Sequence, residues 1–211
     1  GIRGAVVCAS ELDEVRVNED NTVSAEAGAL LSRIARRAQR SGLTGAEFAG
    51  GIPGSLGGAV YMNAGAYDGT MAGIVQETEF VDGEGNICTL KGDEHGFDYR
   101  TSVFRKHPDW TVLRSNMQLQ NGDSAAILDK MNDFAQRRRD KQPLNFPSAG
   151  STFKRPVGHF AGQLIEQAGL KGTSVGAAQV SEKHAGFLIN RGGATCDDML
   201  RLIELVQNRV R

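Results

Sequence analysis

The chain has 211 residues, which is enough for one large domain or two small ones with a buried core. Hydrophobic residues make up 40% and charged residues 23%, and the formal net charge is −1. This composition is typical of a globular protein and gives no sign of a nucleic-acid or anionic-membrane partner. No stretch approaches the roughly 20 apolar residues that span a bilayer.

The cysteine spacing and the glycine content give further information on metal sites, disulfides and loops. Cys8, Cys88 and Cys196 are far apart and form no CxxC pair, so we expect no zinc site, no disulfide framework and a reducing compartment. Glycine accounts for 27 of the 211 residues, whereas ordinary usage is about 7%. Its clusters predict tight loops in which the backbone approaches other backbone or a ligand closely.

The N-terminal part of the chain predicts a mixed α+β unit over residues 1–120. Short β-branched runs predict strands at 3–8, 14–17 and 22–27, with a hairpin turn at 18–21. Helical spacing predicts a helix over 29–42 that ends at Gly42. Its apolar positions are Leu30, Leu31, Ile34, Ala35 and Ala38. Further strands are expected at 74–82, 86–90 and 111–120.

A change from sheet-rich to helix-rich sequence near 120–123 predicts a domain boundary, so that the second domain covers 121–211. We expect helices at 123–143, 159–170 and 195–211, with short strands and turns over 174–190. The apolar face of the first helix is Ile127, Leu128, Met131 and Phe134. Its basic end, "RRRDK" at 137–141, is typical of a solvated helix terminus. In the last helix, Thr195 and Asp198 match a capping box, and the apolar stripe is Met199, Leu202, Ile203, Val206 and Val210.

The stretch "GGIPGSLGGAVYMNAGAYDG" at 50–69 is the most unusual in the chain. It is neither GxGxxG nor a phosphate-binding P-loop. Its closely spaced glycines would let backbone N–H groups converge on an anion, with Pro53 opening a helical turn. The alternative is a buried packing loop, and glycine density alone does not separate the two.

Three polar candidates have plain structural alternatives. Arg100 lies between aromatic residues in "FDYRTSVF" and needs an anion if buried; a salt bridge to a carboxylate would satisfy it. His184 in "VSEKHAGF" fits a satisfied hydrogen-bonding residue as well as a catalyst. Ser151 in "PSAGSTFKR" fits a turn or a helix N-cap. The remaining histidines have no metal-ligand spacing.

Four stretches occur together and in order: "GIPGSLGGAVYMNAGAYDG", "YRTSVF", "PSAGSTFKRP" and "QVSEKHAGFLIN". With them the chain closely resembles the UDP-N-acetylenolpyruvoylglucosamine reductase (MurB) family over essentially its whole length. The resemblance implies an α+β fold: the second lobe of a vanillyl-alcohol-oxidase-type (PCMH-type) FAD-binding domain over 1–120, then an α+β substrate-binding domain over 121–211.

The resemblance also implies a two-stage reduction in the bacterial cytoplasm that serves peptidoglycan synthesis. NADPH reduces FAD, and UDP-N-acetylglucosamine enolpyruvate then takes a hydride at C3 and a proton at C2 to give UDP-N-acetylmuramate. The implied partner is this small nucleotide sugar; no nucleic acid, membrane, protein partner or metal is implied.

Residue by residue, the resemblance gives Arg100 as the arginine that stabilises the enolate and Ser151 as the proton donor. The expected substrate-binding residues are Lys154, Arg155, Lys183, His184 and Asn190. The expected FAD-lining residues are Gly51, Ile52, Pro53, Gly54, Gly57, Gly58, Asn63 and Gly65.

Two departures from the family pattern bear on activity. The chain opens on Gly1 in an apolar run, and the family's first FAD lobe and its catalytic glutamate have no counterpart in the sequence. We therefore expect a fragment of an enzyme that is inactive by itself. Two alternatives stay open: another flavin oxidoreductase of the same superfamily, or a non-catalytic nucleotide-sugar binding module.

Overall fold

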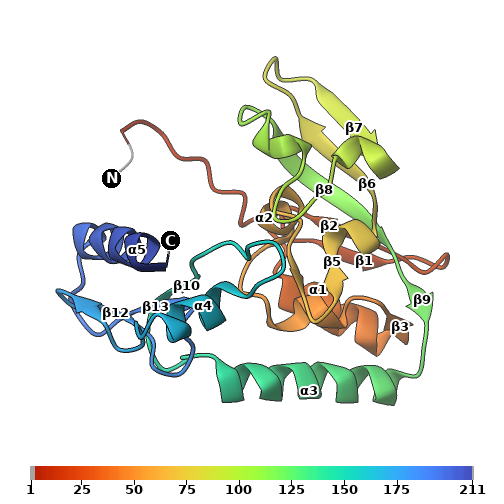
Figure 1. Cartoon of the computed structure of the whole chain (residues 1–211). Helices are drawn as coiled ribbons and strands as arrows, with labels where there is room; N and C mark the ends of the chain where they lie inside the picture. The colour runs from red at the N-terminus through yellow and green to blue at the C-terminus, as the bar shows by residue number, and fades with distance from the viewer. Residues whose placement is uncertain (1–2, 211) are drawn as a thin grey trace. The chain divides into compact units, whose positions relative to one another are not determined.

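The computed structural model describes residues 3–210, which form two compact units divided between Ala135 and Gln136. The first unit contains a five-stranded antiparallel sheet in the order β1-β2-β8-β6-β7 (Figure 1). The strands are β1 (Val15–Val17), β2 (Thr22–Glu26), β6 (Val75–Val81), β7 (Ile87–Lys91) and β8 (Thr111–Gln118). Each lies where a strand was predicted, and Asn21 with φ 63 closes the predicted hairpin between β1 and β2.

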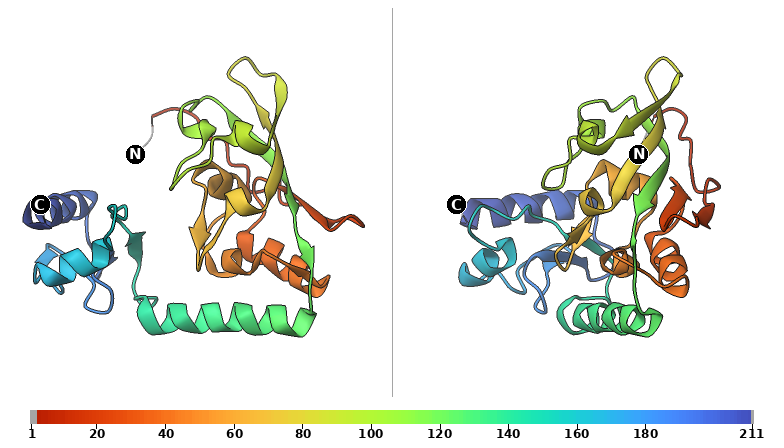
Figure 2. Two further views of the ribbon diagram at one scale, coloured as in Figure 1. Left: turned by 45° about the vertical axis from the view of Figure 1, so that its right-hand side comes forward. Right: turned by 90° about the vertical axis from the view of Figure 1, so that its right-hand side faces the viewer.

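One face of this sheet is buried because side chains alternate along each strand. In β2, Val23 and Ala25 are buried, while Ser24 and Glu26 point to the other face. That other face is polar and forms a hollow of about 330 Å³ lined mainly by charged side chains. The apolar face therefore needs a cover, which α1 (Leu31–Arg40) and α2 (Leu56–Tyr61) provide (Figure 2).

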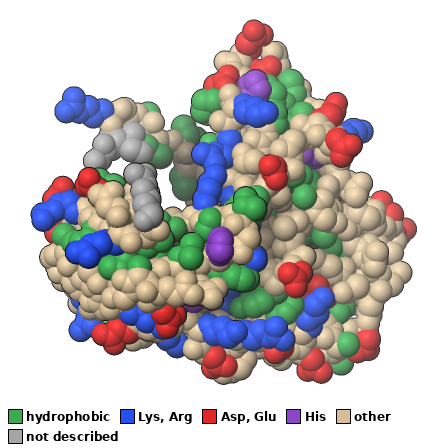
Figure 3. Space-filling model, viewed as in Figure 1, with side chains coloured by type: hydrophobic (Ala, Val, Ile, Leu, Met, Phe, Trp, Pro, Cys, Tyr) green, Lys and Arg blue, Asp and Glu red, His purple; other side chains and the backbone are tan. Residues whose placement is uncertain are grey.

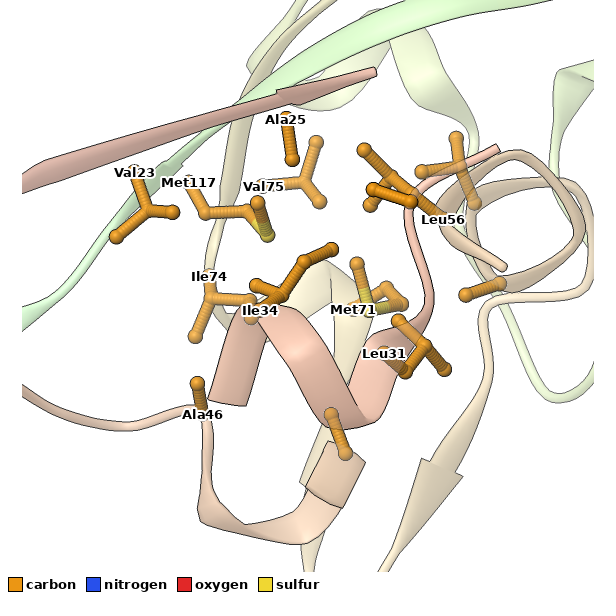
Figure 4. Packing of buried hydrophobic residues seen from close by; sticks show 14 of the residues in the cluster. Val23, Ala25, Leu31, Ile34, Ala46, Leu56, Met71, Ile74, Val75 and Met117 are labelled. Carbon is orange, nitrogen blue, oxygen red and sulfur yellow. The ribbon is translucent and has the colours of Figure 1, made fainter. Parts of the chain in front are cut away.

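Helix α1 buries the apolar face predicted for residues 29–42, with one exception. Leu31 and Ile34 point into the core alongside Val23 and Met117 of the sheet (Figure 4), whereas Leu30 precedes the helix and is 57% exposed. The helix ends at Arg40, and Gly42 then adopts φ +68, a conformation that glycine takes without strain.

Several short elements of the first unit had no sequence prediction. They are β3 (Leu43–Thr44) paired with β9 (Gln120–Asn121), β4 (Gly65–Ala66) paired with β5 (Gly69–Thr70), and the 3-10 turns η1 (Glu47–Gly51), η2 (Met71–Gly73), η3 (Gly92–His95) and η4 (Val103–Arg105). His95 in η3 is fully buried, and its ring nitrogens lie 2.8 Å from Gly92 O and Thr78 Oγ1. His95 is therefore a core residue whose two ring nitrogens both have hydrogen-bond partners.

The strand predicted at 3–8 is wrong. These residues form no strand, and Val6 and Val7 are 69% and 95% exposed. The apolar run has strand propensity, but within residues 3–210 no strand edge pairs with it. Without a ladder of backbone hydrogen bonds, propensity alone does not hold a strand.

Helix α3 (Ser124–Lys141) begins in the first unit and ends in the second, and it matches the helix predicted at 123–143. Ile127 and Phe134 are buried as predicted, whereas Leu128 is exposed. The basic end was expected to be solvated, and Arg137, Arg139 and Lys141 are exposed, whereas Arg138 is buried. Figure 3 shows acidic and basic side chains interspersed on the surface shown, in line with the near-zero net charge.

The second unit packs two helices on a four-stranded antiparallel sheet in the order β10-β13-β12-β11. Its elements are β10 (Ser148–Ser151), α4 (Ala161–Gln167), β11 (Ser174–Val175), β12 (Ala178–Val180), β13 (Phe187–Asn190) and α5 (Cys196–Val210). Helix α4 is shorter than the predicted 159–170, because Phe160 is its N-cap residue and Gly169 adopts φ 70 soon after its end.

Helix α5 confirms the predicted capping box and apolar stripe. Thr195 N–H donates to Asp198 Oδ2 at 2.9 Å, and Asp198 N–H donates to Thr195 Oγ1 at 3.1 Å. Leu202 and Val206 are buried in a core of their own. The last residue of the predicted helix, Arg211, lies outside the described residues. No helix within 3–210 is long and apolar enough to cross a membrane.

Candidate functional site

The glycine-rich stretch folds as the end of η1, a bend, helix α2 and the β4–β5 hairpin. Two backbone hydrogen bonds join the bend to the start of α1. Leu31 N–H donates to Gly54 O at 3.0 Å, and Leu56 N–H donates to Ala29 O at 2.9 Å. These bonds fix the bend and the first turn of α2 to the start of α1.

The glycines of this stretch fall into two kinds. A Cβ on Gly57 would lie 3.1 Å from Ala27 Cβ, and one on Gly65 would lie 2.7 Å from Gly69 O, so close packing accounts for both. A Cβ on Gly54 or Gly58 would meet nothing within 4 Å. Packing therefore gives no reason for these two exposed glycines, although Gly54 has φ +158, which other residues rarely adopt. Both leave room for a ligand to approach the backbone.

The same bend presents backbone donors. Within residues 3–210, no hydrogen bond is made by the N–H groups of Gly54, Ser55 or Gly58. Free N–H groups beside uncovered glycines suit the diphosphate of a dinucleotide cofactor. Gly51 and Pro53 are also exposed and Ile52 is half-buried, so the expected FAD-lining residues fit such a group.

Asn63 differs from the other residues predicted to line FAD, because its side chain is buried and engaged. Its Nδ2 donates to Asp98 O at 3.0 Å, and its Oδ1 accepts from Ala72 N–H at 2.9 Å. Its backbone has φ 42. The amide therefore joins three separate segments of the first unit.

Arg100 is half-buried next to this junction. Its Nη1 donates to Asn63 O at 3.3 Å and its Nη2 to Gly65 O at 2.7 Å, and its guanidinium carbon lies 5.3 Å from the centre of the Tyr99 ring. The salt bridge considered from the sequence is not formed with any carboxylate of the described chain. The guanidinium has five N–H donors, so most of them stay open to an anionic ligand.

Ser151 is the last residue of β10 in the second unit and is exposed. The alternative considered from the sequence was a turn or a helix N-cap, and Ser151 is in neither. It pairs with Phe187 of β13, and the neighbouring Thr152 N–H donates to Gly186 O at 3.0 Å. A Cβ on Gly186 would lie 3.5 Å from Ser151 Oγ. Gly186 thus keeps the space beside the hydroxyl clear.

His184 contacts the same glycine. Gly186 N–H donates to His184 Nδ1 at 3.1 Å, which requires an unprotonated Nδ1. A Cβ on Gly186 would also lie 3.1 Å from His184 Cε1. Burial lowers the pKa of His184, so the ring is neutral at pH 7 with its proton on Nε2.

Of the other residues expected to bind substrate, Lys154 borders a hollow, whereas Arg155, Lys183 and Asn190 contact other groups of the protein. Lys154 is exposed and borders an apolar hollow of about 300 Å³ beside α4 and α5. Arg155 lies over the Phe160 ring at 3.8 Å from its centre. Lys183 Nζ donates to Arg139 O at 2.6 Å. Asn190 Oδ1 accepts from Gly192 N–H at 2.8 Å, which shapes a loop.

The structure thus forms two clusters, one in each unit: Arg100 with Asn63 and Gly65, and Ser151 with His184. Two members of these clusters, Ser102 and Gly186, were not predicted from the sequence. Ser102 is 2% exposed and its Oγ donates to Tyr61 O at 2.8 Å. A hydroxyl two residues after the arginine and a glycine two residues after the histidine were the available signals. Residues 3–210 contain no cluster of three metal-binding side chains.

Two family profiles match this chain. Residues 2–91 match the profile of an FAD binding domain, and residues 142–211 match that of the C-terminal domain of UDP-N-acetylenolpyruvoylglucosamine reductase. The reductase of Clostridium novyi (strain NT) is 52% identical over 211 residues, which is 100% of this chain and 68% of the relative. That of Caldanaerobacter subterraneus is 53% identical over 211 residues, covering 100% of this chain and 69% of the relative.

A solved structure gives the same result for the fold. The crystal structure of the reductase from Thermus caldophilus matches with a TM-score of 0.80 and 37% identity. The match covers 88% of this chain and 68% of the solved chain. The chain therefore belongs to the UDP-N-acetylenolpyruvoylglucosamine reductase family.

Proposed function

We propose that this chain takes part in the FAD-dependent reduction of UDP-N-acetylenolpyruvoylglucosamine to UDP-N-acetylmuramate, with NADPH as the reductant, in peptidoglycan precursor synthesis. The observation that carries the proposal is Arg100. Its guanidinium is held by two backbone carbonyls of the glycine-rich stretch and has no carboxylate partner in the described chain. A fixed, uncompensated cation is what a substrate carboxylate needs.

The chain's own residues divide the binding work. The free N–H groups of Gly54, Ser55 and Gly58 would hold the cofactor's diphosphate. Bound there, FAD supplies the hydride that the enolpyruvyl double bond receives. Residues 1–120 would form the flavin-binding domain and 121–211 the substrate-binding domain. Lys154, exposed beside an apolar hollow, would bind an anionic part of the substrate.

Arg100 and Ser151 act at different points of the reduction. When C3 of the enolpyruvyl group gains the hydride, negative charge develops at C2 and on the carboxylate, and Arg100 stabilises it. Ser151 Oγ then donates its proton to C2 and recovers a proton from solvent. A serine hydroxyl is a weak acid, so this transfer depends on the strongly basic carbanion at hydrogen-bond distance.

Two finer statements belong to the same proposal. We place the protein in the cytoplasm, where its nucleotide-sugar substrate and NADPH are found. We also expect residues 1–211 expressed by themselves to be inactive, because the family's first FAD lobe and its catalytic glutamate have no counterpart among them. Purification should yield protein without flavin absorbance and without NADPH oxidation; stoichiometric FAD together with turnover would contradict this expectation.

The test of the catalytic assignment is Ser151→Ala in the FAD-loaded holoenzyme, meaning the longer protein of which this chain is expected to be a part, with Ser148→Ala as the matched control on the same strand. Ser151→Ala should leave flavin reduction by NADPH intact and slow reoxidation by the enolpyruvyl substrate by about 10²-fold or more. Ser148→Ala should leave both rates near those of the unmodified enzyme. Unchanged reoxidation in Ser151→Ala would refute the role of this hydroxyl, and tight substrate binding without any reduction would favour a binding module.

A further inference from the structure

Two segments of the first unit, 61–65 and 98–102, are joined by hydrogen bonds in both directions. Asn63 Nδ2 donates to Asp98 O at 3.0 Å, and Ser102 Oγ donates to Tyr61 O at 2.8 Å. Asn63 is 7% and Ser102 2% exposed, so water does not compete for these bonds. Arg100 lies between Asp98 and Ser102 in sequence.

Arg100 completes the junction from the same side. Its two terminal nitrogens donate to Asn63 O and Gly65 O. Backbone carbonyls of the glycine-rich stretch therefore accept hydrogen bonds from Arg100. The side chain of Asn63 itself bonds to the turn that contains Arg100. Asn63 also fixes itself in place, because Ala72 N–H donates to its Oδ1 at 2.9 Å.

The backbone of both residues is strained. Arg100 has φ 54 and Asn63 has φ 42, in the left-handed region that non-glycine residues seldom adopt. Such conformations persist only where the surroundings fix them, and they gather at functional sites. The turn around Arg100 has its own weak closure, in which Asp98 and Thr101 exchange two backbone hydrogen bonds of 3.2 Å. The bonds from Asn63 and Ser102 supply the remaining constraint.

We propose that Asn63 and Ser102 are positioning residues that hold Arg100 in the orientation in which it meets the substrate carboxylate. This inference rests on the proposed role of Arg100. It gives Asn63 a different task from lining the cofactor: its amide acts through the Asp98 turn, not by direct contact with substrate. A misplacement of about 1 Å at a catalytic group can cost about 10²-fold in rate, so loss of the junction should be visible in kinetics.

The main variant is Asn63→Gly, because glycine accepts φ 42 without strain and removes both side-chain hydrogen bonds. The matched control is Asn21→Gly. Asn21 has φ 63 in the β1–β2 turn, and no hydrogen bond of its side chain is found in the described chain. Ser102→Ala is the second variant, in case Asn63→Gly does not fold; it removes only the bond to Tyr61.

Two readouts on the holoenzyme separate positioning from general damage. The first is the order of the Arg100 Nε–H bond vector in ¹⁵N relaxation, which should fall in Asn63→Gly and Ser102→Ala and stay unchanged in Asn21→Gly. The second is reoxidation of reduced flavin by the enolpyruvyl substrate. It should slow by about 10²-fold in Asn63→Gly, with a smaller loss in Ser102→Ala and none in Asn21→Gly.

An ordered Arg100 in both variants would overturn the positioning role. Arg100→Ala measured in the same reoxidation assay tests the proposed function separately. If Arg100→Ala reoxidises normally, the catalytic role of Arg100 fails, whereas the relaxation data still decide whether Asn63 and Ser102 hold it.

Discussion

Glu47 is a buried carboxylate at the start of η1, just before the glycine-rich stretch. It is 4% exposed, accepts from Thr44 Oγ1 at 2.5 Å and from Gly45 N–H at 2.9 Å, and lies 3.6 Å from Lys130 Nζ. Burial by itself raises the pKa of Glu47, but the hydrogen bonds from Thr44 and backbone N–H groups, with the charge of Lys130, outweigh burial and lower it.

A lowered folded-state pKa makes the contribution of Glu47 dependent on pH. Its stabilisation is present above the unfolded pKa of about 4.3 and is lost as pH falls through the lower folded value. Glu47→Gln should reduce the free energy of unfolding by about 1–3 kcal/mol at neutral pH, and the difference should shrink in acid. Urea denaturation across pH measures this. Glu19→Gln at an exposed turn is the control, and an equal loss in both variants would contradict the argument.

His184 should titrate below the ordinary histidine range. Burial lowers its pKa, and protonation at Nδ1 would abolish the hydrogen bond from Gly186 N–H. Because the neutral form is favoured in the fold, this stabilisation is complete above the unfolded pKa of about 6.5 and is lost as pH falls through the folded value. An NMR titration of the His184 Cε1–H resonance should give its inflection below 6.5; an inflection at or above that value would show that the ring is not held as described.

At the scale of elements, helix α2 contains two adjacent glycines in different surroundings: Gly57 is closely packed and Gly58 is not. A Cβ on Gly57 would press on Ala27, whose Cβ and carbonyl oxygen would lie 3.1 and 3.3 Å away. The carbonyl accepts the Gly57 N–H at 2.8 Å and cannot withdraw without losing that bond. A Cβ on Gly58 meets open space.

Alanine substitutions should therefore separate stability from cofactor retention. Gly57→Ala should destabilise the protein by about 1–3 kcal/mol through overpacking. Gly58→Ala should leave stability unchanged or raise it by up to about 1 kcal/mol, since alanine is the better helix former, yet weaken FAD retention. Both measurements are made on the holoenzyme's longer chain: thermal unfolding without added flavin, and FAD titration of each variant. Undiminished FAD binding in Gly58→Ala would remove this glycine from the cradle.

Elements with long, periodic patterns could be predicted from the sequence, and short or partner-dependent ones could not. The capping box and the apolar stripe of helix α5 could both be recognised in the sequence. So could the turn of the β1–β2 hairpin. Residues 3–8 had strand-forming residues, but no strand within the described part of the chain pairs with them. Strand β10 consists of the small residues Ser-Ala-Gly-Ser, and only its pairing with β13 makes it a strand.

The candidate site divides along the same line. Arg100 and Ser151 were named through the resemblance of their motifs to a known family, because their residue types alone left a salt bridge and a turn as alternatives. The contacts around them could not be predicted, since Asn63 reaches Asp98 across 35 residues of sequence. Gly186, which adjoins both Ser151 and His184, likewise has no local signal for its contact with the serine. Contacts between distant residues depend on the fold and leave no periodic trace in one sequence.

At the scale of the whole molecule, the chain has two hydrophobic cores that share no residue. One collects residues from 15 to 119 and the other residues from 165 to 206. Each core contains a helical leucine with almost no exposed surface, Leu31 in α1 and Leu202 in α5. These two leucines form a matched pair for asking how stability is distributed along the chain.

Truncating either leucine to alanine should cost about 2–5 kcal/mol, because lost apolar contact and a residual cavity both oppose folding. If each core stabilises its own unit, Leu202→Ala should lower amide hydrogen-exchange protection in β12, β13 and α5 while leaving β6 and β8 protected, and Leu31→Ala should do the reverse. Exchange followed residue by residue distinguishes this from a single cooperative unit. Equal loss of protection across all of these strands in either variant would mean that the two cores fold as one, and that the two units cannot be destabilised separately.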